Sequence, residues 1–298
     1  MMGLTRRQFL GALGGATAGL ALPRTTRAAQ KGTLGYPESF GVLCDLSLCV
    51  GCRRCEQACN EANDLPAPDQ AFDDPTVLQH LRRTTESAYT VVNTYPQANA
   101  PAVHRKLQCN HCQEPACASA CPVGAFTKTR EGAVIYNPDL CIGCRYCMVA
   151  CPFGIPAYEY HDPLTPRVRK CTLCHERILA GKRPACVEAC PMEALVFGKR
   201  TELLERARNR IAAKPENYLH HVYGEHEVGG TNWLYLSPVP FDQVGLPTNL
   251  GEEPLCAKTG GFLSFIPVVI ALWPAFLGGT WLFKRHNERQ GQQPKEGA

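Results

Sequence analysis

Sixteen of the eighteen cysteines in this 298-residue chain fall into four compact groups. Group I contains Cys49, Cys52, Cys55 and Cys59, and group II contains Cys109, Cys112, Cys117 and Cys121. Group III contains Cys141, Cys144, Cys147 and Cys151, and group IV contains Cys171, Cys174, Cys186 and Cys190. So many closely spaced thiols predict a chain that folds around bound metal, with a small conventional core.

Groups I and III are near-repeats, CVGCRRCEQAC and CIGCRYCMVAC, with the spacing Cys-x2-Cys-x2-Cys-x3-Cys. This is the bacterial ferredoxin motif, in which three cysteines hold one [4Fe–4S] cluster and the fourth holds its neighbour. Gly51 and Gly143 lie inside these loops, where the missing Cβ lets backbone N–H groups approach the cluster sulfurs. Proline follows the last cysteine of groups II, III and IV, whereas Asn60 stands there in group I. The four groups predict four [4Fe–4S] clusters and an electron-transfer function.

Two other kinds of cysteine site are less consistent with these groups. Disulfides occur in exported proteins, but the repeated x2 and x3 spacing is an unusual disulfide framework. Cys-x2-Cys pairs also build four-cysteine zinc sites. Tetrahedral zinc, however, does not require three cysteines on one tight loop and a fourth directly after them. An assay for iron and acid-labile sulfide distinguishes these alternatives.

Two cysteines and a basic pair need separate interpretation. No motif position is vacant for Cys44 or Cys256, so we expect each to be a small buried hydrophobic residue.

Arg169 and Lys170 precede Cys171, where positive charge would favour the more negative reduced state of a cluster and raise its potential. The alternative is that this basic stretch is solvated.

The N-terminus contains Arg6 and Arg7, followed by an apolar stretch from Phe9 to Leu22. A twin arginine before a modest apolar region predicts a Tat export signal. As a helix, the apolar stretch is roughly 21 Å long, too short for a bilayer core of about 30 Å. We therefore predict a signal peptide over residues 1–28, with an ordinary N-terminal helix as the alternative.

Residues 260–283 form an uncharged stretch that makes a helix of roughly 36 Å, enough to span a membrane. Lys284 and Arg285 follow it, and positive residues remain in the cytoplasm. We predict a transmembrane anchor over residues 259–283 and a cytoplasmic tail over residues 284–298. This topology places the cysteine groups in the periplasm. The alternative is a buried core helix.

Short elements are predicted between the groups. Phe126 to Tyr136 predicts a β-hairpin with its turn at residues 130–132, and residues 195–197 predict another strand. Residues 60–108, between groups I and II, are predicted to be an insertion that packs on the cluster-binding core. This insertion has a possible strand around residues 89–93.

The segment after group IV predicts a helix over residues 201–213, with Thr201 as its N-cap. Trp233 and Tyr235 are expected on one face of a strand-like segment. The histidines of residues 220–226 are interpreted as solvated or structural rather than as haem ligands. The net charge of +4 is spread along the chain, and no nucleic-acid-binding patch is apparent.

The order of the four groups, the eleven residues between Cys174 and Cys186 and the Cys-Pro ends resemble the iron–sulfur subunits of DMSO-reductase-type complexes. Matching segments include CIGCRYCMVACPFGIPAYEY, KCTLCHERI, CVEACPMEALVFGKR and HVYGEHEVGGTNWLYL, and the resemblance runs from about Val42 to Phe283. It is closest to members with a C-terminal anchor. These are the HybA-type subunit of periplasmic [NiFe] uptake hydrogenases and the β subunit of formate dehydrogenase. The Tat signal on this chain favours the HybA type.

The expected fold of residues 41–258 is α+β, with two ferredoxin-like [4Fe–4S] pairs built from small hairpins and short helices. The resemblance implies that groups I and IV form one subdomain and groups II and III the other. By resemblance, cluster 1 is held by Cys49, Cys52, Cys55 and Cys190, and cluster 2 by Cys171, Cys174, Cys186 and Cys59. Cluster 3 is held by Cys109, Cys112, Cys117 and Cys151, and cluster 4 by Cys141, Cys144, Cys147 and Cys121.

The resemblance implies a non-catalytic electron-transfer subunit on the periplasmic side of the membrane. Its expected partners are a catalytic [NiFe]-hydrogenase and a quinone-reducing integral-membrane subunit. A molybdenum or tungsten enzyme such as formate dehydrogenase is the alternative catalytic partner. A self-contained iron–sulfur enzyme is less consistent, because the radical-SAM pattern Cys-x3-Cys-x2-Cys is absent. A diffusing ferredoxin is disfavoured by the predicted anchor. The quinone, the direction of electron flow and the cluster potentials are left open.

Overall fold

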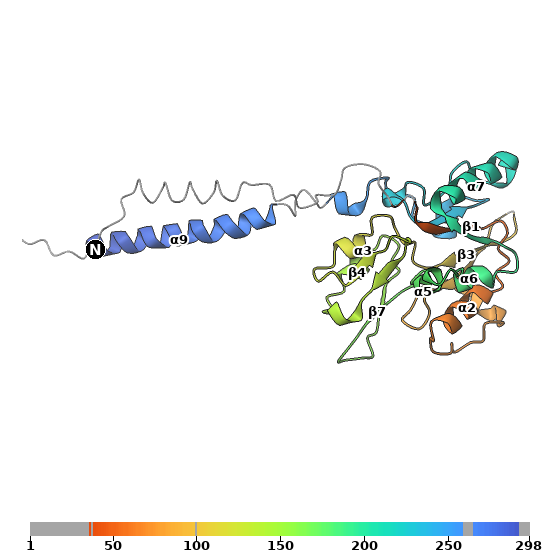
Figure 1. The fold of residues 1–298 in the computed structure, drawn as a ribbon, viewed down its shortest axis with the longest axis horizontal. Coiled ribbons are helices and arrows are strands. Elements are labelled where there is room, and N and C mark those ends of the chain that lie inside the picture. Colours follow the sequence, from red (N-terminus) through yellow and green to blue (C-terminus); the bar gives the residue numbers. More distant parts are fainter. Residues whose placement is uncertain (1–35, 37, 99, 259–264, 292–298) are drawn as a thin grey trace, which may run out of the picture. The chain divides into compact units, whose positions relative to one another are not determined.

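A computed structural model describes residues 36, 38–98, 100–258 and 265–291 (Figure 1). The predicted Tat signal over residues 1–28 lies outside the described residues. The strands are β1 Phe40–Asp45, β2 Val91–Tyr95, β3 Val103–Leu107, β4 Phe126–Lys128, β5 Val134–Tyr136, β6 Ala157–Tyr158, β7 Val168–Arg169, β8 Leu195–Lys199 and β9 Trp233–Leu236. The α-helices are α2 Arg54–Ala62, α3 Ala116–Ser119, α4 Tyr146–Ala150, α5 His175–Leu179, α6 Ala185–Glu188, α7 Arg200–Ala213 and α9 Ile266–Gly291. This mixture of short helices and small sheets confirms the predicted α+β class.

The largest sheet has three strands in the order β8-β1-β9. β1 is antiparallel to β8 and parallel to β9, where Val42 lies opposite Trp233. Because successive side chains point to opposite faces of a strand, Val42 shares an apolar cluster with Trp233 and Tyr235. Leu43 and Leu234 belong to a second cluster on the other face. The prediction that Trp233 and Tyr235 share a face is confirmed, and both faces of β1 are buried.

Helix α7 covers the face of the sheet that carries Leu43. Its buried residues recur at helical spacing and are Leu203, Leu204, Ala207 and Ile211. The predicted helix is confirmed, but Thr201 as its N-cap is wrong, because the helix begins at Arg200. β8 runs directly into α7, and the Arg200 N–H donates to the backbone oxygen of Ser39 at 2.9 Å. The backbone just before β1 thus satisfies the first N–H group of the helix, which has no partner within the helix.

Three hairpin-like pairs complete the cluster-binding region. β4 and β5 pair antiparallel with Phe126 opposite Tyr136, which confirms the hairpin predicted there. Its turn contains Gly132, whose φ of 101° is a conformation that glycine adopts readily. β2 pairs with β3, so the strand expected around residues 89–93 exists but begins at Val91. The strand expected at residues 195–197 is β8, and β6 pairs with β7.

Helix α9 contains a candidate membrane span, Ile266–His286, with a hydropathy of 1.8. None of this apolar segment is buried in the structure, which does not fit the alternative of a core helix. Residues 259–264, at the start of the predicted anchor, lie outside the described residues. The described part of the chain therefore has one helix that is long and apolar enough to cross a membrane, at the predicted place.

Short helices from different cysteine groups pack against one another. α2, which follows the loop of group I, packs on α6 of group IV. α3 of group II packs on α4 of group III. Figure 1 shows α2 beside α6, although these helices are far apart in the sequence. The fold thus brings group I to group IV and group II to group III.

Candidate iron–sulfur sites

The loops of groups I and III share one backbone conformation. Gly51 and Gly143 have φ values of 70° and 71°, and Arg53 and Arg145 have φ values of 59° and 61°. Helices α2 and α4 begin directly after these arginines. Left-handed residues turn the chain sharply and gather backbone N–H groups on the inside of the turn. The near-repeat in sequence is therefore a near-repeat in structure.

Backbone N–H groups donate to cysteine sulfur in all four groups. In group I the Gly51 N–H donates to Cys49. The pairs in the other groups are Ala125 N to Cys121 Sγ at 3.2 Å, Gly143 N to Cys141 Sγ at 3.4 Å and Leu173 N to Cys171 Sγ at 3.4 Å. Such hydrogen bonds favour the thiolate form of cysteine. They also tune the potential of a cluster that the thiolates hold.

One cavity is lined by cysteines from both ends of the cluster-binding region. Its cysteines from groups I and IV are Cys49, Cys52, Cys55 and Cys190. Cys44 of β1 and Lys106 of β3 also line it. The first four are the residues that the resemblance implies for cluster 1.

A second cavity has the reciprocal composition, with one cysteine from group I and three from group IV. These are Cys59, Cys171, Cys174 and Cys186. Lys106 and Trp233 contribute to its lining as well. The set matches the one implied for cluster 2, and Lys106 lines both cavities.

Electrostatic coupling relates the thiols of groups II and III. Burial raises the pKa of the Cys112 thiol well above its usual range, and three further thiols enlarge the rise: Cys109, Cys151 and Cys117. Burial raises the pKa of the Cys147 thiol to about 11, and three other thiols enlarge that rise: Cys141, Cys144 and Cys121. Like charges at close range produce this effect. Both groupings agree with the ligand sets implied for clusters 3 and 4.

The donor sets fit iron–sulfur clusters. All eighteen cysteines lie in the described residues, and none forms a disulfide there. In the same part of the chain, no three His, Cys, Asp or Glu side chains gather closely enough to hold a single metal ion. Four thiols around a shared cavity suit a four-iron cube, which offers one corner iron to each thiolate.

Buried lysines accompany the thiols. Lys170 is 4 % exposed and donates to the backbone oxygen atoms of Val134 and Cys171, so the alternative of a solvated stretch is wrong for this residue. Lys106 is 2 % exposed, and sequence reasoning missed it. The sequence did contain a signal, which is a lysine shortly before a cysteine group. Lys106 lies three residues before Cys109 of group II, and Lys170 lies directly before Cys171 of group IV.

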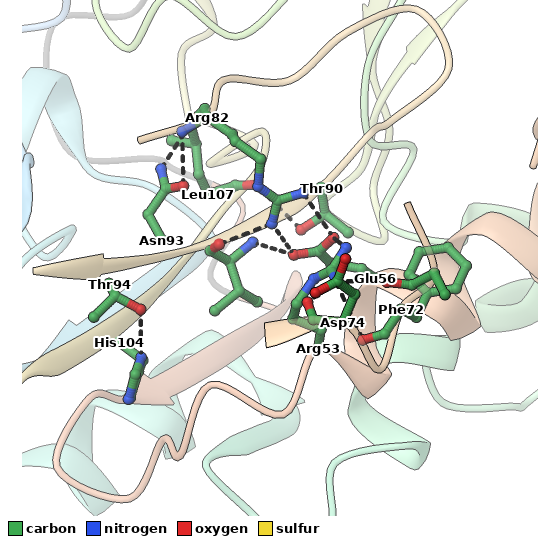
Figure 2. A network of polar contacts seen from close by, with 12 residues as sticks. Arg53, Glu56, Phe72, Asp74, Arg82, Thr90, Asn93, Thr94, His104 and Leu107 are labelled. Atoms are coloured by element: carbon green, nitrogen blue, oxygen red, sulfur yellow. Dashed lines mark hydrogen bonds and ion pairs between the residues drawn. The ribbon is translucent and has the colours of Figure 1, made fainter. Parts of the chain in front are cut away.

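A buried carboxylate fixes the segment after group I against α2 (Figure 2). Glu56 accepts hydrogen bonds from Arg53, from Arg82 and from the Val92 N–H, the last at 2.6 Å. Arg53 also donates to three backbone oxygens within residues 71–74. One carboxylate thereby joins α2, β2 and the segment between them.

The predictions for the two remaining cysteines and for the histidines of residues 220–226 agree with the structure only in part. Cys44 is 1 % exposed, as predicted for a small hydrophobic residue. Cys256 as a buried residue is wrong, because it is only partly buried and donates to Glu114 Oε2 at 3.4 Å. The exposed His221 and His226 pair with carboxylates, as expected for solvated histidines.

Comparison with known proteins identifies relatives of this arrangement. A profile of the 4Fe–4S dicluster domain matches residues 102–200. The chain is 51% identical over 290 residues to a protein of Nitratidesulfovibrio vulgaris, covering 96% of this chain and 78% of the relative. It is 38% identical over 277 residues to the hydrogenase-2 operon protein HybA of Escherichia coli O157:H7, covering 82% and 84%.

A third relative is the iron–sulfur subunit of the nitrate-inducible formate dehydrogenase of Escherichia coli K12. The identity is 38% over 207 residues, which cover 67% of this chain and 69% of that subunit. The similarity to HybA and to the formate dehydrogenase subunit agrees with the resemblance carried by the cysteine motifs. The chain belongs to the iron–sulfur electron-transfer subunits of the DMSO reductase family.

Proposed function

We propose that this chain carries four [4Fe–4S] clusters and relays electrons from a periplasmic [NiFe]-hydrogenase to a quinone-reducing membrane subunit. The observation that carries this proposal is the exchange of cysteines between groups I and IV. Cys190 lines the cavity of the first three group I cysteines, and Cys59 lines the cavity of the first three group IV cysteines. That exchange is the ligation rule of two-cluster ferredoxins.

The two cavities and the coupled thiols support the proposed ligand sets. They are Cys49, Cys52, Cys55 and Cys190 for cluster 1, Cys171, Cys174, Cys186 and Cys59 for cluster 2, Cys109, Cys112, Cys117 and Cys151 for cluster 3, and Cys141, Cys144, Cys147 and Cys121 for cluster 4. A bound [4Fe–4S] cluster accepts and releases one electron at a time. The protein supplies thiolates, N–H donors and buried positive charge around each site. In this proposed role the chain transfers electrons only, and it makes or breaks no bond of a substrate.

Two ligand cysteines are exposed, and they belong to different sets. Cys52 lies beside the exposed Val50, and Cys144 lies beside the exposed Ile142 and Tyr146. Exposed apolar side chains around a redox ligand favour contact with a partner protein. We assign the two surfaces around Cys52 and Cys144 to the two partners, because electrons must enter the chain at one place and leave at another.

The proposed location is the periplasmic face of the cytoplasmic membrane. Helix α9 is the anchor in this proposal, and the twin arginines at Arg6 and Arg7 are the export signal. Lys284 and Arg285 follow the apolar run and favour a cytoplasmic C-terminus.

The hydrogenase is preferred as partner because the similarity to HybA extends over more of both chains than the similarity to the formate dehydrogenase subunit. Purification of the intact complex in a mild detergent under anoxic conditions tests this choice. Nickel in the co-purifying large subunit supports the proposal. Molybdenum or tungsten there would instead identify the partner as a molybdenum or tungsten enzyme such as formate dehydrogenase. Iron analysis should give about sixteen iron atoms per chain if four cubes are bound.

The exchange of cysteines has its own test. Cys59→Ser should alter the same EPR signal as Cys174→Ser, although Cys59 is a group I residue. Cys55→Ser should alter a different signal, shared with Cys190→Ser. If Cys59→Ser and Cys55→Ser instead affect one common signal, each group binds its own cluster and the exchanged ligand sets are wrong.

A further inference from the structure

Lys106 is a buried ammonium that lines two cysteine cavities at once. The residue is 2 % exposed and lies on β3, opposite Val92 of β2. Its neighbours in one cavity are the thiols of Cys49, Cys52, Cys55 and Cys190, and in the other those of Cys59, Cys171, Cys174 and Cys186. No other lysine lines either of these two cavities.

The fold holds this ammonium firmly in place. Lys106 Nζ lies 4.6 Å from the centroid of the Trp233 ring, a cation–π contact with a fully buried aromatic residue. Nζ also donates to Gln108 Oε1 at 3.3 Å. Gln108 is itself fixed, because its Nε2 donates to the hydroxyl of Tyr235 at 2.7 Å. The position of the charge is therefore set by β9 and by the residues that follow β3.

The ammonium has few oxygen partners compared with the other lysines near the thiols. Among the described residues, Gln108 Oε1 is the one oxygen that accepts from Lys106, although an ammonium has three N–H donors. Lys170 donates to two backbone oxygens, and Lys128 donates to three oxygen acceptors. The surroundings of Lys106 thus leave donors for the contents of the two cavities.

Within the described residues, no buried carboxylate neutralises Lys106. The buried acidic residues of the described chain are Asp45 and Glu56. Asp45 binds Arg210 and the hydroxyl of Tyr218, while Glu56 binds Arg53 and Arg82. A charge buried without a partner is strongly unfavourable. The negative charge that balances Lys106 must therefore come from the two sets of thiolates and what they bind.

We propose that Lys106 is the shared counter-ion of clusters 1 and 2 and raises the reduction potential of both. This inference rests on the proposed function, since it requires clusters in both cavities. One-electron reduction makes each cluster with its four thiolates one unit more negative, and the proton count of the lysine does not change. A fixed positive charge in a region of low dielectric favours the more negative state. Because the charge borders both cavities, it acts on the two potentials together.

The test is an EPR-monitored redox titration of the anoxically purified complex, with Lys106→Gln and Lys106→Met as neutral variants. Both should shift two of the four midpoint potentials to lower values and leave the other two unchanged. Lys106→Arg, which keeps the charge, should restore the two midpoints toward the wild type. The control is Lys182→Gln, an exposed lysine between Cys174 and Cys186, which should shift none. Cys55→Ser and Cys174→Ser assign the signals of clusters 1 and 2.

The outcomes separate this inference from the proposed function. Wild-type protein without clusters in these two sets would overturn the proposed function. Four clusters in the neutral variants with wild-type midpoints, or with a shift in fewer than two, would overturn the role of Lys106 alone. If the neutral variants lose iron, the Lys106→Arg variant distinguishes the two explanations. Retention of four clusters by Lys106→Arg supports the role of Lys106 as a counter-ion. Loss of clusters from Lys106→Arg shows that the side chain only contributes packing.

Discussion

The guanidinium of Arg82 donates to both carboxylate oxygens of Glu56. Arg82 Nη2 lies 2.5 Å from Glu56 Oε1, and Arg82 Nη1 lies 3.2 Å from Glu56 Oε2. Glu56 is 5 % exposed and directly follows Cys55, so this pair connects the segment after group I to the loop of group I (Figure 2). Glu56→Ala leaves two guanidinium groups without their carboxylate. We expect it to lower the free energy of unfolding by about 3–5 kcal/mol, measured by chemical denaturation of the holoprotein.

The matched control for Glu56 is Glu61→Ala, which removes an exposed carboxylate from the same helix. Its carboxylate accepts a hydrogen bond from the side chain of Gln57 at 2.9 Å. Such an exposed contact should change the free energy of unfolding by less than about 0.5 kcal/mol. Equal losses for the two variants would show that the buried network does not stabilise the loop.

Gly51→Ala should impair cluster binding more than Gly143→Ala. Both residues have a left-handed φ, which costs an alanine roughly 1–2 kcal/mol. A Cβ at Gly51 would also lie 2.6 Å from His104 Nδ1, whereas a Cβ at Gly143 would lie 3.0 Å from the Tyr158 hydroxyl. His104 cannot move away freely, because Nδ1 is hydrogen-bonded to Thr94 Oγ1 at 2.9 Å. Iron per chain and the thermal midpoint check the order, and the reverse order would contradict the proposed crowding.

Lys128→Met should destabilise the hairpin of β4 and β5. The ammonium donates to the backbone oxygens of His111 and Gly132 at 2.8 Å each and to Asn232 Oδ1 at 2.9 Å. Methionine keeps the length of the side chain but removes all three donors, at a cost of about 1–3 kcal/mol. Differential scanning calorimetry should show a lower midpoint than for Lys182→Met, which removes an exposed ammonium. Matching midpoints would mean that water replaces the lost donors.

Cluster assembly should become more complete as the pH rises. Burial, followed by repulsion from neighbouring thiols, raises the pKa of Cys117 to about 12 and that of Cys147 to about 11. Thiols with raised pKa values stay protonated near neutral pH, and protons then compete with iron for the sulfur. Reconstitution of iron-free protein with iron and sulfide should therefore yield more cluster per chain at about pH 8 than at about pH 6. A yield independent of pH would contradict this competition.

Local features of the fold were predictable from the sequence, because short-range patterns determine them. The hairpin between Phe126 and Tyr136 follows from strand-forming residues on both sides of a glycine turn. Trp233 and Tyr235 share a face because side chains alternate along a strand. Thr201 failed as a cap because β8 continues into α7, a continuity that capping preferences do not record.

Non-local features had no comparable signal. The parallel pairing of β1 with β9 joins residues at opposite ends of the cluster-binding region, and no spacing in the sequence indicates it. The position of Lys106 depends on that pairing, since Trp233 of β9 supports its ammonium. For the candidate sites, cysteine spacing predicted the proposed ligands, whereas the buried charges around them required the tertiary structure.

The place of β1 in the sheet also has a consequence for biosynthesis. Strand β1 is among the first described elements to leave the ribosome, but its two neighbours, β8 and β9, end at Lys199 and Leu236. Contacts so distant in sequence form slowly, because the intervening chain must be closed into a loop first. Nascent chains shorter than 236 residues therefore leave one edge of β1 without its partner strand. Group I is synthesised first, but the sheet beside it is completed only after β9 has been made.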